Sequence, residues 1–211
     1  FNDISKLFLQ QPEINLKLKN NYQNDILFEA IKCNNNYILD LIFKLPNFKI
    51  NFGFKSLNNL SYFHEAIKHN NKIILKYLKK INNFYNYSDS NNNTLLHYAA
   101  FYERTDYLNL LKDKFNFDLD SKNNFGENVL NYYFKSKKKN FIIIKIIISD
   151  INSLDSNKNN CLINMLQNFK NINNKIINLL IKNEINLFHC NQNEISPLLQ
   201  TILNNSFDNF N

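Results

Sequence analysis

The stretch NNNTLLHYAA, residues 91–100, recurs in altered form at five other places in the chain. We align the copies on one apolar residue, the anchor, and number the other positions of each copy from it. Successive anchors are 36, 33, 34, 32 and 36 residues apart. A period near 33 residues indicates a stack of similar supersecondary units rather than a single globular core. The anchors are Leu27, Phe63, Leu96, Leu130, Leu162 and Leu198.

Each copy carries the sequence signals of a pair of helices. A short polar residue stands at position −2, where it can cap a helix by accepting hydrogen bonds from backbone N–H groups. Amphipathic runs such as YILDLIF (37–43) and KIILKYL (72–78) follow and predict a second helix. The residues at position −2 are Asp25, Ser61, Thr94, Asn128, Asn160 and Ser196.

These units resemble the ankyrin repeat, whose pattern is T-P-L-H-x-A, then a second helix, then a turn. The closest copies are TLLHYA (94–99), SYFHEA (61–66) and SPLLQT (196–201). The resemblance implies an all-α fold, an ankyrin-repeat solenoid of stacked helix pairs with short β-turn fingers. It also implies that His64 and His97 hydrogen-bond neighbouring backbone and tie one unit to the next.

The copies depart from the ankyrin pattern in two respects. The pattern has glycine at position −4, and Gly126 alone supplies it here. Asn59 and Asn92 are good substitutes, because asparagine tolerates left-handed backbone, whereas Lys158 and Glu194 cost more. In addition, the large pair 133–134 stands where small residues belong, so looser stacking is expected over residues 123–188.

The repeat pattern predicts one ankyrin-repeat domain over residues 1–211, because each unit of such an array contacts only its neighbours. The partial first unit, 1–18, reads as an outer helix without an inner one, and the partial last unit, 190–211, reads as the reverse. These ends suggest an excerpt from a longer protein. The complete units are expected near 19–54, 55–87, 88–121, 122–153 and 154–189.

The amino-acid composition indicates which kinds of partner and which cellular compartment to expect. The formal net charge is +7, from 25 basic and 18 acidic residues, which favours anionic partners. However, Asn, Lys, Ile, Phe and Tyr dominate, and A/T-rich codons alone could supply this excess. Three cysteines are too few for a disulfide scaffold, so a reducing, cytoplasmic setting is expected. The apolar run FIIIKIIIS (141–149) is shorter than the roughly 20 residues that span a bilayer.

No pattern in the sequence predicts catalysis, a cofactor or a metal site. The cysteines Cys33, Cys161 and Cys190 lack both metal-ligand spacing and an evident activating base. A chain with two glycines can hardly form a glycine-rich phosphate loop. We therefore expect a non-catalytic protein–protein interaction module that acts as a monomer.

Periodic lysines suggest where a partner binds. In ankyrin repeats, position −8 lies on the finger turn and position +5 ends the inner helix facing the concave groove. We predict a basic groove with an aromatic centre that binds an acidic protein or peptide, thickened by the lysines at 137–139. The alternative is that lysine is simply common in this chain. The candidate binding residues are Lys19, Lys55 and Lys122 at position −8, Lys32, Lys68 and Lys135 at position +5, and Phe101 and Tyr102.

Other functions remain open on the sequence alone. The chain could be the substrate-recruiting ankyrin region of a larger enzyme, such as a membrane-bound protein palmitoyltransferase. A weaker hypothesis is a peripheral anchor on anionic membrane, held by the basic residues. Nucleic acid is an unlikely partner, because no recognised nucleic-acid module is present.

Overall fold

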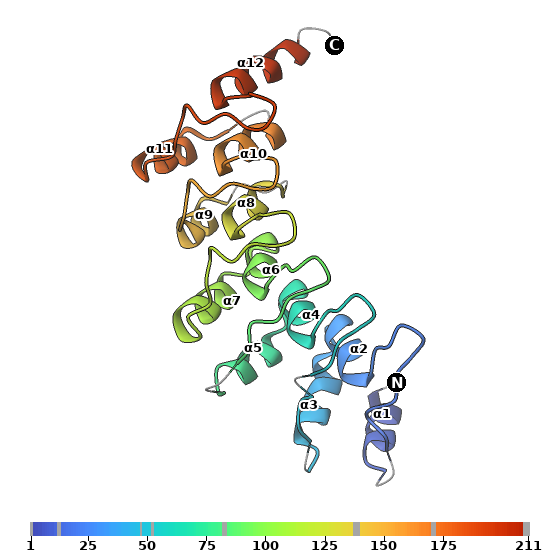
Figure 1. The fold of residues 1–211 in the computed structure, drawn as a ribbon. Coiled ribbons are helices and arrows are strands. Elements are labelled where there is room, and N and C mark those ends of the chain that lie inside the picture. The colour runs from blue at the N-terminus through green and yellow to red at the C-terminus, as the bar shows by residue number, and fades with distance from the viewer. Residues whose placement is uncertain are drawn as a thin grey trace. The chain divides into compact units, whose positions relative to one another are not determined.

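The computed structural model describes residues 2–11, 14–46, 48–51, 53–81, 84–136, 140–169 and 172–208. These residues form helices joined by turns (Figure 1). They divide into two compact parts, Phe1–Ser90 and Asn91–Asn211, here called the N-terminal part and the C-terminal part. The division falls inside the unit predicted over 88–121.

The N-terminal part has two layers of helices. The inner layer pairs α2 with α4, and in the outer layer α3 packs against both α1 and α5. Each complete unit is an inner helix followed by an outer one, α2 with α3 and α4 with α5. The helix bounds are α1 Asn2–Leu9, α2 Ile26–Lys32, α3 Asn36–Lys44, α4 Tyr62–Lys68 and α5 Lys72–Leu78.

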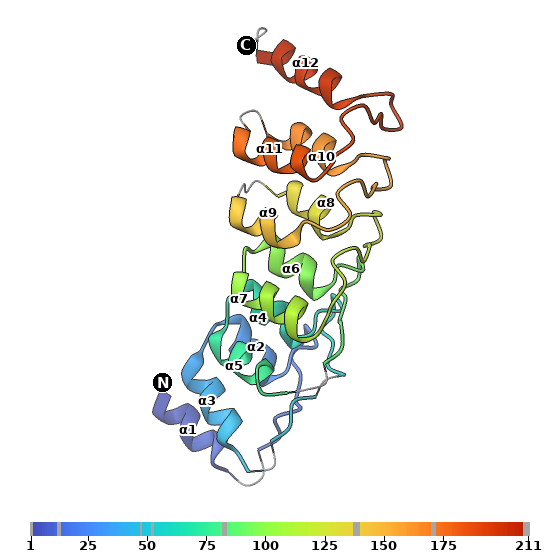
Figure 2. The same cartoon turned by 90° about the vertical axis from the view of Figure 1, so that its left-hand side faces the viewer.

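The C-terminal part repeats this arrangement. Its inner helices stack in the order α6, α8, α10, α12, and its outer helices in the order α7, α9, α11 (Figure 2). The outer helix α7 continues as a π-helical turn, η1. The bounds are α6 Leu95–Phe101, α7 Thr105–Asn109, η1 Leu110–Lys114, α8 Val129–Phe134, α9 Phe141–Ile147, α10 Cys161–Asn168, α11 Asn174–Lys182 and α12 Pro197–Asp208.

The anchors form the core between successive inner helices. Leu27, Leu130 and Leu162 are at most 4% exposed. Leu198 of α12, in the same position, is 71% exposed, and no further inner helix follows α12 among the residues that the structure describes. Helices this short are marginal in isolation, so this packing supplies most of their stability.

The predicted helix caps are confirmed. The side chains of Asp25 and Asn128 accept hydrogen bonds of 2.9 Å from backbone N–H groups three residues ahead, and Asn160 accepts one of 3.0 Å. His97 provides the predicted link between units. Its Nδ1 accepts from the Thr94 N–H at 3.2 Å, so Nε2 carries the proton and donates to the Glu127 carbonyl at 3.1 Å.

Position −4 closes every finger turn in left-handed backbone, with φ between 58° and 70°. Glycine fills this position once, at Gly126. At the other five positions a non-glycine residue adopts the same left-handed backbone, which is strained for a residue with a side chain. The predicted turn geometry is therefore present even at the two positions where the sequence made it costly. The remaining five residues are Gln23, Asn59, Asn92, Lys158 and Glu194.

A polar residue at position −7, which the sequence interpretation missed, holds each finger of the C-terminal part together. The side-chain oxygen of Asn123 accepts from the backbone N–H groups of Phe125 at 2.9 Å and Glu127 at 3.0 Å. Asp155 and Asn191 make the equivalent pairs of bonds in the next two fingers.

Two of these position −7 residues also join successive units through a polar ladder of buried amides. Asn123 donates to the side-chain oxygen of Asn93 at 2.8 Å, and Asn191 donates to that of Asn159 at 2.8 Å. All four side chains are at most 7% exposed. Much of the asparagine in the fingers is therefore structural.

Two large residues occupy positions where the ankyrin pattern has small ones. Tyr133 and Phe134 are at most 1% exposed. The Tyr133 hydroxyl donates to Glu103 at 2.8 Å and accepts from the Asn140 N–H at 2.9 Å, so its polar end is satisfied. Burial raises the pKa of Tyr133, which stays a neutral phenol. Both large side chains are therefore accommodated in the packing between units. Looser stacking over residues 123–188 stays a prediction.

Candidate protein-binding surface

In the N-terminal part, the position +5 lysines end α2 and α4, as predicted, but each lies beside an acid on the same helix. Lys32 is 3.6 Å from Glu29 and Lys68 is 3.2 Å from Glu65. The lysine side chains are 47% and 40% exposed, so they are accessible to a partner. The carboxylates nevertheless cancel most of their field, because opposite charges this close neutralise one another at a distance.

Lys135, at the same position in the C-terminal part, is more tightly engaged. Its ammonium group contacts a Glu127 carboxylate oxygen and lies 3.7 Å from Asp155. Both acids are buried, at most 5% exposed. Lys135 therefore balances two buried negative charges in its own fold. The lysines at 137–139, expected to thicken the positive end, lie outside the described residues.

The finger lysines make structural contacts. The Lys55 ammonium donates to the Ser88 carbonyl at 3.1 Å, and that of Lys122 donates to the Leu154 carbonyl at 3.0 Å. Each bond reaches position −8 of the following unit. The Lys55 ammonium also lies 5.4 Å from the Tyr87 ring centroid, and burial lowers the pKa of this lysine. In the first finger, Lys19 lies 5.2 Å from the ring centroid of Phe54.

The two predicted aromatic residues belong to a larger cluster in the C-terminal part. Phe101 lies 5.1 Å from Tyr102 and 5.6 Å from Tyr132 of α8, between ring centroids, and Tyr98 lies 6.0 Å from Tyr102. All four side chains are partly exposed. We call these four residues the aromatic patch.

The sequence interpretation missed half of this patch and all of the acid partners. Tyr98 and Tyr132 occupy position +2, one helical turn before position +5, and Glu29 and Glu65 occupy it in the N-terminal part. Residues three apart on a helix are neighbours, so tabulating position +2 would have found them. The acid partners of Lys135, Glu127 and Asp155, lie in finger turns, and no spacing along one helix predicts that they meet this lysine.

The described residues contain no cluster of three His, Cys, Asp or Glu side chains placed to hold a metal ion. Cys33 and Cys190 are exposed thiols, and Cys161 is buried. Burial raises the pKa of Cys161 well above its ordinary value, which disfavours the reactive thiolate form. Within the same residues, no helix is both long enough and apolar enough to cross a bilayer.

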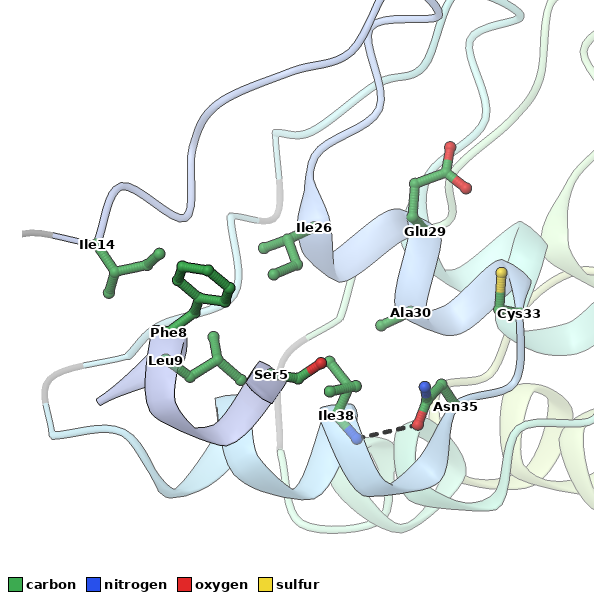
Figure 3. A pocket seen from close by; sticks show the side chains of 10 residues that line it. All are labelled: Ser5, Phe8, Leu9, Ile14, Ile26, Glu29, Ala30, Cys33, Asn35 and Ile38. Atoms are coloured by element: carbon green, nitrogen blue, oxygen red, sulfur yellow. Dashed lines mark hydrogen bonds between the residues drawn. The ribbon is translucent and has the colours of Figure 1, made fainter. Parts of the chain in front are cut away.

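An apolar pocket of about 340 Å³ lies between α1 and α2 of the N-terminal part. Figure 3 shows Phe8 and Leu9 of α1 and Ile26 of α2 around this space, which we call the α1–α2 pocket. The Asn35 side chain at its rim is already occupied, because it accepts from the Ile38 N–H at 3.2 Å to cap α3.

The repeated helix pair, its finger turn and the His97 link can be compared with known families. The family model described as ankyrin repeats, in three copies, matches residues 27–123. These residues are ankyrin repeats. The match begins at the Leu27 anchor and takes in the next two anchors, and the ankyrin geometry of caps and left-handed finger turns continues in the fingers beyond it. No curated protein matches the chain.

Ankyrin repeats generally mediate protein–protein interactions and are typically non-catalytic. In general, repeat arrays bind their partners through one extended surface that the stacking of similar units leaves exposed.

Proposed function

We propose that the chain is a non-catalytic protein-interaction module and that its main contact is the aromatic patch. Phe101 and Tyr102 are partly exposed, and neighbouring rings on α6 and α8 hold them in place. Rigid aromatic side chains lose little conformational freedom on binding and bury much area, and they are typical affinity anchors. This cluster is the observation that carries the proposal.

Of the position +5 lysines, Lys135 lies in the C-terminal part with the aromatic patch, and in this proposal it acts as a donor at the edge of the site. Lys32, Lys68 and Lys135 keep internal acid partners, so an acidic partner segment gains less from them than their charge suggests. The finger residues Lys19 and Lys55 hold their ammonium groups over aromatic rings and contribute mainly to shape. Lys122 similarly donates to a backbone carbonyl. Binding should therefore depend weakly on salt.

We place this interaction in a reducing intracellular compartment. Cys33 and Cys190 are exposed thiols, and such thiols persist where glutathione keeps them reduced. The proposal concerns binding alone and assigns the chain no reaction of its own.

The proposal is tested by affinity purification with three baits: the parent chain, the pair Phe101→Ala and Tyr102→Ala, and the pair Phe115→Ala and Phe117→Ala. The last pair is a matched control, because these rings also lie close together, 5.9 Å apart, but follow η1 and are not part of the aromatic patch. A partner retained by the parent and the control, but lost from the patch variant, supports the proposal.

Rates of association and dissociation with that partner then separate the contribution of the aromatic residues from that of the lysines. Truncating a central aromatic anchor should cost at least about 2 kcal/mol, or about 30-fold, mostly as faster dissociation. Replacing Lys32 and Lys68 with Gln should change the rates only a few-fold at either low or high salt. If the patch and control variants lose the same amount of binding affinity, or neither loses any, the result would contradict the proposed site.

A further inference from the structure

A carboxylate stands next to the aromatic patch. Glu103 directly follows Tyr102 of the patch in the sequence, and it is partly exposed. One of its oxygens accepts the 2.8 Å hydrogen bond from the Tyr133 hydroxyl. Glu103 forms no ion pair with any residue that the structure describes. Its negative charge is therefore available to a partner.

The contact that Glu103 makes runs alongside a contact of the patch. Phe101 of α6 meets Tyr132 of α8 with 5.6 Å between ring centroids, and Glu103 meets Tyr133, the next residue of α8. Both contacts start at the C-terminal end of α6, which packs against α8. The carboxylate and the rings therefore lie together where these two inner helices meet.

A group of three charges close to the patch is negative on balance. Lys135 is the single ammonium group beside both Glu127 and Asp155, so one negative charge is left over. The side chains of the two acids are 3% and 0% exposed, and salt screens buried charges weakly. Lys135 ends α8 and follows Tyr132 of the patch by three residues, which makes the two neighbours on the helix.

The remaining charges near the end of α6 cancel. Arg104 and Asp106 contribute one charge of each sign, and each has a contact of its own within the chain. Among the described residues, the surroundings of the aromatic patch therefore carry a negative charge, although the chain as a whole carries +7. A partner that complements this place offers a cation.

We propose that the aromatic patch binds an arginine side chain of the partner, with the guanidinium group on the ring faces and its N–H groups directed to Glu103. This inference rests on the proposed function, because it names the chemical group that the patch receives. Aromatic faces attract cations, and arginine stacks on them through its flat guanidinium. The same group has five N–H donors, so it can stack on a ring and still donate to a carboxylate.

The spacing of the rings favours arginine over other cations. Phe101 and its neighbours have ring centroids 5.1–6.0 Å apart, so these rings are already in contact with one another. A rounded ammonium group therefore cannot enter between them as it enters an aromatic cage, whereas a flat guanidinium needs one exposed ring face. An acidic segment would meet Glu103 with like charge, which costs binding energy.

Short random peptides displayed on phage serve as the probe. Peptides selected on the parent chain are counter-selected on the pair Phe101→Ala and Tyr102→Ala, so those that remain require the aromatic patch. We expect each of these to contain an arginine on which its binding depends. If no peptide requires the patch, the proposed function and this inference both fail.

Two matched changes then test the arginine contact. Replacing the arginine of a selected peptide with citrulline, which keeps the shape and removes the charge, should weaken binding about 10-fold or more. Glu103→Gln should weaken the arginine peptide to a similar extent and leave the citrulline peptide almost unchanged. Glutamine keeps an oxygen that can accept from Tyr133, and circular dichroism checks that the variant folds.

Asp113→Asn is the matched control. It removes the same charge from an exposed carboxylate of η1 that belongs to neither the aromatic patch nor the group around Lys135. This variant should bind the arginine peptide as the parent does. Patch-dependent peptides that bind equally well with citrulline, that are acidic and lack arginine, or that lose the same affinity in Glu103→Gln and Asp113→Asn would overturn the arginine site and leave the proposed function standing.

Discussion

Residue-scale strain is concentrated at position −4 of the fingers. Gly126 has a φ of 70°, and a Cβ there would lie 2.9 Å from the Ser156 backbone nitrogen. Lys158 adopts nearly the same conformation, with a φ of 58°, but carries a side chain. Left-handed backbone costs a non-glycine residue about 1–2 kcal/mol, so the two positions should respond to substitution in opposite directions.

We predict that Gly126→Ala lowers the free energy of unfolding by more than about 1 kcal/mol, from backbone strain and the contact with Ser156. Lys158→Gly should raise it by up to about 1 kcal/mol, because relief of strain exceeds the entropy that glycine adds to the unfolded chain. Urea unfolding of both variants measures these changes. A loss of stability at Lys158→Gly would show that its side chain contributes more than its backbone costs.

The anchor position offers a second residue-scale prediction. Leu96 is fully buried, and truncating such a leucine removes both its transfer free energy and its packing. Leu96→Ala should therefore destabilise the chain by about 2–5 kcal/mol. Leu198→Ala is the matched control at the same position, because Leu198 is 71% exposed. Measured in dilute solution, it should cost under about 0.5 kcal/mol, and similar costs at both sites would contradict the assigned packing.

At the scale of the element, the short inner helices depend on their caps. The fully buried Asn128 caps α8 through its side-chain oxygen, and its amide also donates to the Asp150 carbonyl at 3.1 Å in a partly buried bond. Asn128→Ala should cost about 2 kcal/mol, at the upper end for a helix cap. Ser196→Ala, at the same position before α12, should cost about 0.5 kcal/mol, because its single bond to Leu199 is exposed. Thermal unfolding compares the two, and the reverse order would contradict this account.

The elements themselves could be predicted from the sequence, and most of the site's contacts could not. Caps, anchors and the left-handed finger residues follow from a repeat that places the same residue type at the same position. Glu65 beside Lys68 follows from a three-residue spacing, although it was overlooked. By contrast, Lys135 meets Glu127 and Asp155 only because two successive fingers fold against one another. Such a contact depends on how units stack, which no local pattern records.

At the scale of the whole molecule, net charge is a poor guide to the binding surface. The formal charge of +7 suggested a basic groove, yet several of the periodic lysines satisfy acids, carbonyls or rings of their own fold. A periodic lysine can therefore mark a repeated structural contact as readily as a repeated recognition site. The aromatic patch, which depends on a single unit and its neighbour, carries more specific information about a partner.

The polar ladder also bears on how a gene of this kind can change in length. Asn123 meets Asn93 as Asn191 meets Asn159, with the same amide donating to the same oxygen one unit earlier. The two contacts lie two periods apart, so removing or duplicating the coding sequence of two whole periods would join ends that already suit one another. Unequal recombination between such periods therefore produces shorter or longer arrays directly, without new complementary surfaces having to arise by point mutation.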